Sequence, residues 1–139
     1  MIIVKILIDT NVFNNKRFCN WLLNSEKQKY LPSIAYMEFL YHQIKKGNTE
    51  SMVNTFLKEM NVKIVPFGKN EAKKAVANAL GNWDFSENAR DYAIGGTALS
   101  LNAKLITNNK KHFKWMKNVI TPEEFLKQDK ETSTDQPSH

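Results

Sequence analysis

The stretch Ile2-Ile3-Val4-Lys5-Ile6-Leu7-Ile8-Asp9-Thr10-Asn11 decides the fold of this chain. Six of its first seven residues are aliphatic and four are isoleucine, a composition typical of a strand that is buried on both faces of a parallel sheet. The apolar run ends abruptly at Asp9, and the carboxyl ends of such strands lie at the edge where open α/β sheets bind ligands. Asp9 therefore either caps a following helix or belongs to a site that supplies a cationic partner or a metal.

Strand-like and helix-like segments alternate along most of the chain. After the first strand, at residues 2–8, the patterns predict strands at 29–31, 62–67, 104–107 and 119–120. They predict helices at 14–27, 34–46, 48–60, 70–80, 86–101 and 110–117, and a last helix that starts at residue 121. This alternation predicts an α/β fold of three layers, α/β/α, in which helices cover both faces of a central, mainly parallel sheet.

The size and charge of the chain suggest one basic domain. Its 139 residues are enough for a single core, and we expect a domain at residues 1–127 followed by a polar, disordered tail at 128–139. The domain carries a formal net charge of +8 and the tail carries −2. A polyanion such as nucleic acid is therefore the first partner to consider, although any net charge also supplies solubility.

The sequence also predicts the cellular location of the protein. The apolar runs are shorter than the roughly 18 residues that a membrane span requires, so we expect no membrane association. The apolar N-terminal stretch contains Lys5 and leads into Asp9 without the small residues of a signal-peptide cleavage site. With a single cysteine, Cys19, no intramolecular disulfide can form, and we expect a cytoplasmic protein.

Two further acidic residues have unusual neighbours. Glu38 is the only charged residue within residues 34–41, which indicates a functional role unless it faces solvent while its neighbours pack. Asp91 precedes a small, apolar helical segment with two adjacent glycines, Gly95 and Gly96. Because each glycine within a helix costs roughly 1 kcal/mol relative to alanine, we expect the pair to let the helix approach the sheet and to bring Asp91 to its carboxyl edge.

Asp9, Glu38 and Asp91 are thus expected to converge from one strand end and two helices. Three neighbouring carboxylates repel one another, so they require a cation between them. A lysine or an arginine could supply it, but carboxylates and water are the preferred ligands of Mg²⁺ and Mn²⁺, and no histidine–cysteine set has zinc spacing. A Mg²⁺ or Mn²⁺ site beside a basic surface predicts hydrolysis of a phosphodiester bond by a metal-activated water.

Four segments of the chain resemble, in the same order, the motifs of the PIN-domain ribonucleases. They are Ile8-Asp9-Thr10-Asn11-Val12-Phe13, Tyr36-Met37-Glu38-Phe39, residues 90–99 around Asp91, and residues 105–113 around Thr107. Each is weak alone, but together they extend over nearly the whole domain, and the likeness is closest to the small VapC-type toxins. The resemblance implies that Asp9, Glu38 and Asp91 are the catalytic residues and bind the metal, and that Asn11 and Thr107 are polar supports.

The fourth segment departs from the family pattern at Asn109. The family often has an aspartate here, whereas an amide can bind a metal or a water but adds no negative charge. We therefore expect Asn109 to be a weak metal ligand, with one strong Mg²⁺ site and a second site completed by the RNA phosphate. The alternative is that Asn108 and Asn109 only form a turn that caps the next helix.

Four lysines follow directly on this segment: Lys110, Lys111, Lys114 and Lys117. If the fold is as predicted, they flank the edge where the acidic residues meet and would steer RNA toward them. The alternative is that they form a solvated face without a partner.

These features predict a Mg²⁺- or Mn²⁺-dependent endoribonuclease. The resemblance implies the toxin of a toxin–antitoxin pair, with RNA as substrate, an antitoxin protein as partner and a homodimer. The alternatives are a PIN-type RNA-processing nuclease outside such a pair and a non-catalytic RNA-binding or protein-interaction module. A phosphatase with an aspartate nucleophile is disfavoured, because that chemistry usually has a second acid two residues later, where this chain has Asn11.

Overall fold

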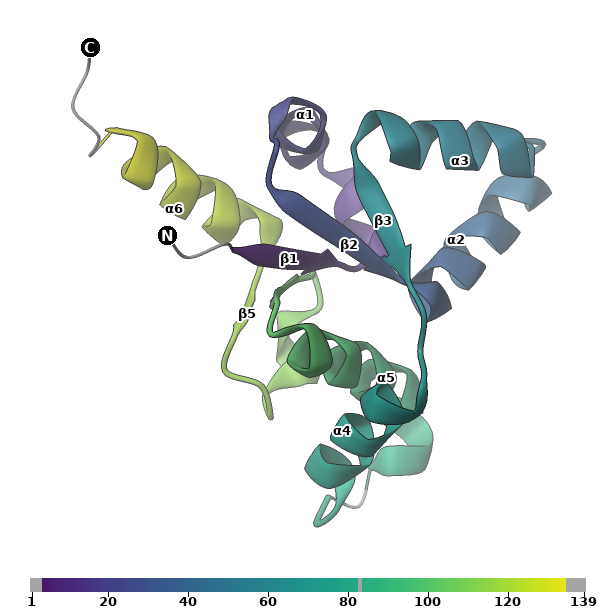
Figure 1. Ribbon diagram of the computed structural model, residues 1–139, viewed down its shortest axis with the longest axis vertical. Coiled ribbons are helices and arrows are strands. Elements are labelled where there is room, and N and C mark those ends of the chain that lie inside the picture. Colours follow the sequence, from purple (N-terminus) through teal and green to yellow (C-terminus); the bar gives the residue numbers. More distant parts are fainter. Residues whose placement is uncertain (1–3, 83, 135–139) are drawn as a thin grey trace.

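The computed structural model describes residues 4–82 and 84–134, and a five-stranded sheet forms its centre (Figure 1). The strand order is β3-β2-β1-β4-β5, and every neighbouring pair is parallel. The strands are β1 (Lys5–Ile8), β2 (Gln28–Pro32), β3 (Val62–Val65), β4 (Lys104–Ile106) and β5 (Val119–Ile120). The strand predicted to be buried on both faces is therefore the middle one, while residues 2 and 3 of that prediction lie outside the described residues.

Helices cover both faces of this sheet. Ile6 and Ile8 of β1 belong to one core cluster and Leu7 to another, because successive side chains of a strand point to opposite faces. The first face is covered by α1 (Lys16–Asn24), α2 (Ser33–Lys45), α3 (Glu50–Glu59) and α6 (Pro122–Thr134), and the second by α5 (Phe85–Leu101) with α4 (Lys69–Ala79) packed against it. The predicted three-layer α/β/α fold with a parallel central sheet is confirmed.

Two short 3-10 helices lie at the carboxyl edge of the sheet, η1 (Thr10–Asn14) after β1 and η2 (Lys110–Phe113) after β4. The first was not predicted, and the second replaces most of the helix predicted at 110–117. Both fill the short connections that leave the two central strands. Within the described ranges, no helix is both long and apolar enough to span a membrane.

The last helix reaches further than the sequence predicts. α6 continues to Thr134, so residues 128–134 are helical where a disordered tail was expected. Asp129 explains the difference, because its carboxylate accepts a hydrogen bond from Trp21 Nε1 at 3.1 Å and pairs with Lys27 Nζ at 3.2 Å, which fastens α6 to α1 and its following loop. The remaining predicted tail, residues 135–139, lies outside the described residues, and the domain boundary at 127 stays a prediction.

The adjacent glycines of α5 leave room for the neighbouring helix α4 and for the side chain of Trp115, rather than for the sheet. A Cβ atom on Gly96 would lie 2.6 Å from the carbonyl oxygen of Glu71 and 2.8 Å from the amide nitrogen of Ala75, both in α4. A Cβ atom on Gly95 would collide with the ring of Trp115. The predicted close approach is therefore real, but its partners are α4 and the segment after η2, so the prediction of a close approach to the sheet was wrong.

We expect Gly96→Ala to lower the free energy of unfolding by about 1–3 kcal/mol, because the new methyl group would meet backbone atoms of α4 that cannot rotate away. This loss exceeds the roughly 1 kcal/mol by which alanine is favoured over glycine within a helix. Urea unfolding followed by circular dichroism measures the change. Ser51→Ala, at an exposed position of α3, is the matched control and should stay within about 0.5 kcal/mol of the wild type. An equally stable Gly96→Ala protein would contradict the close packing of α4 on α5.

Candidate active site

The candidate site lies at the carboxyl edge of the sheet, where the strand order reverses. β1 leads to β2 on one side and its neighbour β4 leads to β5 on the other, and such a reversal opens the crevice in which open α/β sheets bind ligands. Asp9 directly follows β1 and is only 1% exposed, and Thr107 directly follows β4 and is fully buried. The strand order therefore places these two side chains next to each other.

Asp9 is oriented by hydrogen bonds from both strand ends. Its Oδ1 accepts a hydrogen bond from the backbone N–H of Thr10 at 2.8 Å, which makes Asp9 the N-cap of η1. Its Oδ2 accepts two longer bonds, from Thr107 Oγ1 at 3.4 Å and from Asn11 Nδ2 at 3.5 Å. Asp9 therefore caps a helix, as one of the two interpretations of the sequence had it, and its Oδ2 has only weak partners.

Thr107 joins the neighbouring polar residues into one network. Its hydroxyl oxygen accepts hydrogen bonds from Asn11 Nδ2 at 3.3 Å and from the backbone N–H of Asn109 at 3.1 Å. Asn11 Oδ1 in turn accepts from the backbone N–H of Asn108 at 3.1 Å, so the loop after β4 is fastened to η1. The two predicted supports lie beside Asp9. Asn109 contributes its backbone, while its exposed side chain makes no hydrogen bond within the part of the chain that is described.

Glu38 of α2 and Asp91 of α5 meet Asp9 around the guanidinium of Arg90. Arg90 Nη2 donates to Asp9 Oδ1 at 3.0 Å, and Nη1 donates to Asp91 Oδ1 at 3.3 Å. Arg90 Nε lies 2.7 and 2.8 Å from the two oxygens of Glu38. The structure therefore brings together the three acidic residues that the sequence singled out, from one strand end and two helices.

Arg90 is the residue that sequence reasoning missed. The argument that three carboxylates need a cation allowed for an arginine, and Arg90 directly precedes Asp91, which is the signal that could have identified it. Burial lowers the pKa of the Arg90 guanidinium, but hydrogen bonds and charge from Glu38 and Asp9 outweigh this effect and raise the pKa above its ordinary value. Arg90 is therefore a permanent positive charge at the centre of the site.

The side chain of Asp91 is only 13% exposed. Burial raises the pKa of its carboxyl group above the ordinary value, and the charges of Arg90 and His112 oppose this rise only in part. His112 Nδ1 lies 3.6 Å from Asp91 Oδ2, so it forms an ion pair only when protonated. Three carboxylates against one guanidinium leave a formal charge of −2 when the imidazole is neutral, and this is the charge that one divalent cation would neutralise.

The donor set fits a hard divalent cation in its chemistry. Carboxylate oxygens are the ligands that Mg²⁺ and Mn²⁺ prefer, and a hydroxyl and an amide lie beside them. In the present arrangement, however, no group of three or more Asp, Glu, His or Cys side chains within residues 4–82 and 84–134 is placed to hold an ion. The space between the three acids is taken by the Arg90 guanidinium.

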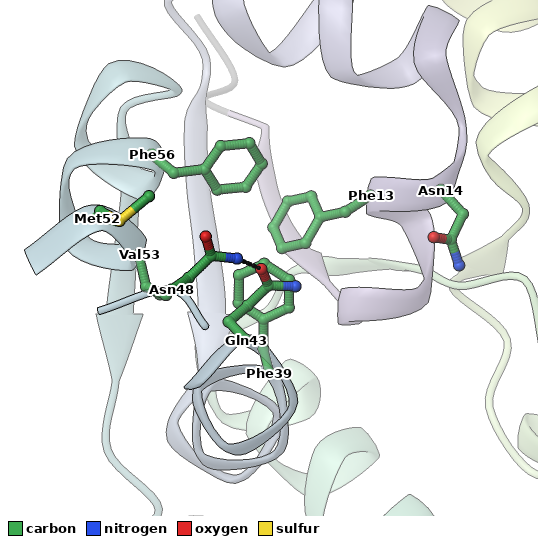
Figure 2. Close-up of a pocket in the computed structure, with 8 residues that line it drawn as sticks. All are labelled: Phe13, Asn14, Phe39, Gln43, Asn48, Met52, Val53 and Phe56. Carbon is green, nitrogen blue, oxygen red and sulfur yellow. Dashed lines mark hydrogen bonds between the residues drawn. The ribbon is translucent and has the colours of Figure 1, made fainter. Parts of the chain in front are cut away.

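A groove lined by aromatic rings lies between η1, α2 and α3 (Figure 2). The rings of Phe13, Phe39 and Phe56 point toward one another, with centroids 5.0 to 6.0 Å apart. Asn48 Nδ2 donates a hydrogen bond to Gln43 Oε1 at 2.7 Å beside these rings. Two of the elements that form this aromatic groove, η1 and α2, also contribute to the acidic site, so the groove and the site share their framework.

The predicted RNA-binding lysines lie on and after η2, which begins close to the end of β4. All four are exposed and line a depression on the surface: Lys110, Lys111, Lys114 and Lys117. Lys110 differs, because its Nζ is 3.1 Å from a carboxylate oxygen of Glu124 in α6. It is thus less available to a phosphate than the sequence suggested.

We expect Thr107→Val to remove the protection of the Asn109 amide from hydrogen exchange, because valine offers no acceptor to that N–H group. The loss of this acceptor should also lower the free energy of unfolding by about 1–2 kcal/mol. Hydrogen exchange followed by NMR measures the first effect residue by residue. Thr107→Ser keeps the hydroxyl group and is the matched control, in which the amide should stay protected; equal exchange in both variants would show that this hydroxyl does not organise the loop.

Comparisons with known proteins agree with this architecture. The family model of the PIN domain matches residues 6–118, whereas no match was found among curated proteins. Among solved structures, the chain is similar to a toxin–antitoxin complex from Klebsiella pneumoniae, with 26% identity, a TM-score of 0.67, and coverage of 84% of this chain and 96% of that one.

Two further solved structures share the fold at lower identity. A DNA-bound VapBC from Salmonella typhimurium is 21% identical, with a TM-score of 0.63 and coverage of 86% of this chain and 98% of that one. VapBC2 from Rickettsia felis, bound to a DNA fragment from its promoter, is also 21% identical, with a TM-score of 0.59 and coverage of 85% and 97%. Because the family model extends over most of the strands and helices that build the acidic site, this chain belongs to the PIN domain family.

Proposed function

We propose that this protein is a divalent-metal-dependent endoribonuclease and the toxin of a toxin–antitoxin pair. The observation that carries the proposal is the gathering of Asp9, Glu38 and Asp91 at the reversal point of the sheet, in a chain of a family whose members are generally nucleases. Mg²⁺ or Mn²⁺ bound by these acids would activate a water molecule and neutralise charge that develops on the phosphate.

Asp9 and Glu38 differ in burial and mobility, which suits them to different roles in metal binding. Asp9 is buried and fixed by the N–H group of Thr10, so it offers a preorganised ligand that needs no rearrangement. The side chain of Glu38 is 36% exposed, which leaves it room to turn toward a ligand at the sheet edge. Asn11 and Thr107 keep Asp9 in position, and Asn109 is the weakest candidate for a ligand because only its backbone joins the network.

We propose that RNA is the substrate and that the lysines after β4 guide it. Exposed positive charges beside an acidic, metal-binding crevice attract the phosphate backbone and compensate the repulsion between the acids and the RNA. Because Lys110 is paired with Glu124, we assign the main contribution to the other three: Lys111, Lys114 and Lys117.

We further propose an antitoxin protein as partner, a homodimer and a cytoplasmic location. The Klebsiella pneumoniae neighbour is a toxin–antitoxin complex, and α2 and α3 expose large apolar side chains. Four of them are between 50 and 63% exposed, namely Met37, Tyr41, Ile44 and Met52. An apolar surface of this kind is typical of a protein–protein contact, and a partner bound there would lie on the helix that carries Glu38.

We expect Asp9→Asn to lower RNA cleavage by at least about two orders of magnitude, because the loss of a ligand charge weakens metal binding. Binding of RNA should survive, since the lysines are unchanged. Cleavage of a labelled single-stranded RNA in Mg²⁺ or Mn²⁺, together with a mobility-shift assay, separates the two effects. Glu59→Gln, which removes an exposed acid of α3, is the control and should cleave normally. Cleavage that persists unchanged in Asp9→Asn or in EDTA would refute the proposal.

The double substitution of Lys114 and Lys117 by alanine should weaken RNA binding and flatten its dependence on salt. Each lost phosphate contact is expected to reduce the slope of log affinity against log salt concentration by about 0.7 for a single strand. Fluorescence anisotropy at several salt concentrations measures the slope. The same substitution of Lys58 and Lys63, which are exposed on α3 and β3, is the matched control, and an equal effect of both pairs would mean that binding is not localised at η2.

A further inference from the structure

We propose that Arg90 competes with the divalent ion for the same carboxylate oxygens, so that its guanidinium leaves them when the ion binds and thereby sets the metal affinity of the site. This inference rests on the proposed metal-dependent function. It concerns a residue of this chain that would act as an internal rival of the metal, and it follows from which oxygens Arg90 occupies.

Arg90 engages four of the six carboxylate oxygens of the site. These are Asp9 Oδ1, Asp91 Oδ1 and both oxygens of Glu38. Asp9 Oδ2 and Asp91 Oδ2 remain, the first with hydrogen bonds of 3.4 and 3.5 Å and the second 3.6 Å from His112 Nδ1. An ion held by all three acids must take an oxygen from Glu38, and both oxygens of that carboxylate already lie within 2.8 Å of Arg90 Nε.

Charge alone would allow both cations to stay, because three carboxylates can neutralise one guanidinium and one divalent ion. The guanidinium and an ion that bridges Asp9 and Glu38 would, however, compete for the same space. Arg90 Nη2 lies 3.0 Å from Asp9 Oδ1 and 2.7 Å from Glu38 Oε1, which is between the two oxygens that an ion bridging these acids would approach to about 2.1 Å. The guanidinium therefore occupies the space that an ion bridging these two oxygens would need.

The side chains of the site are suited to such an exchange. The Arg90 side chain is 35% exposed, so it can turn outward into solvent, and Glu38 is equally open, whereas Asp9 is buried and fixed. Without metal, Arg90 keeps the three acids from repelling one another, which stabilises the folded protein. With metal bound, the ion takes over this task and the arginine becomes dispensable.

The exchange can be observed directly by NMR in the wild-type protein. The chain contains only two arginines, Arg17 and Arg90, so its spectrum of arginine Nε–H groups is simple, and the variant Arg17→Gln assigns the two signals. On titration with Mg²⁺, we expect the Arg90 Nε–H signal to shift and to exchange faster with water, because its bond to Glu38 breaks, while the signal of Arg17 stays. If calorimetry shows that Mg²⁺ binds and the Arg90 signal does not change, the inference is wrong although the metal site stands.

Calorimetric titration with Mn²⁺ provides the quantitative test. Arg90→Gln should bind Mn²⁺ of the order of tenfold more tightly than the wild type, because a competing positive charge is gone, and Arg17→Gln should bind as the wild type does. Arg90→Gln should also melt at a lower temperature without metal and gain more from Mn²⁺ in a thermal-shift assay. Equal or weaker affinity in Arg90→Gln would overturn the inference.

The two proposals fail in distinguishable ways. If neither the wild type nor Arg90→Gln binds Mn²⁺, the proposed metal-dependent function fails and the inference fails with it. Should Arg90→Gln not fold, Arg90→Lys preserves the charge with fewer hydrogen bonds and is expected to bind Mn²⁺ with intermediate affinity, and the NMR titration of the wild type needs no variant of Arg90 at all.

Discussion

The buried carboxylate of Asp9 is the constraint on which the site depends. A charge that is almost fully removed from water costs several kcal/mol unless a partner of opposite charge reaches it, and Arg90 Nη2 is that partner at 3.0 Å. The partner comes from α5, so α5 has to cross the edge of the sheet close to the end of β1. Gly95 and Gly96, further along the same helix, let Trp115 and α4 pack directly against the backbone of α5.

The same guanidinium connects the two sides of the sheet edge. Its bonds to Glu38 reach α2, which covers the face opposite to α5. An arginine that joins three acids from three elements stabilises the fold without a metal, and for the same reason it opposes an ion that uses these acids. On our proposal, the stability of the metal-free protein and its affinity for a divalent ion are set against each other in one side chain, a common relation at functional sites.

The surroundings of the acids provide what a nuclease toxin would need beyond its catalytic centre. Basic side chains lie on and after η2, on the connection that follows β4, and the aromatic groove lies between η1, α2 and α3. RNA and a protein partner would thus approach the acids over different elements. Glu38 belongs to the helix of the groove, so a protein bound there could influence a proposed metal ligand through the helix that carries it.

Local patterns in the chain were sufficient for the architecture. The aliphatic run that ends at Asp9, and the alternation of strand-like and helix-like segments after it, predicted the parallel sheet and its helical layers, because period and composition report how a segment is buried. A lone acid at residue 38 and another at residue 91 were also recognisable, since ionised side chains among apolar neighbours require an explanation. Such local patterns could not predict contacts between residues that are distant in the sequence. Arg90 is adjacent to Asp91 in the sequence, but its contacts with Asp9 and Glu38 depend on which distant elements the sheet order brings together, and so do the Asp129 contacts that extend α6.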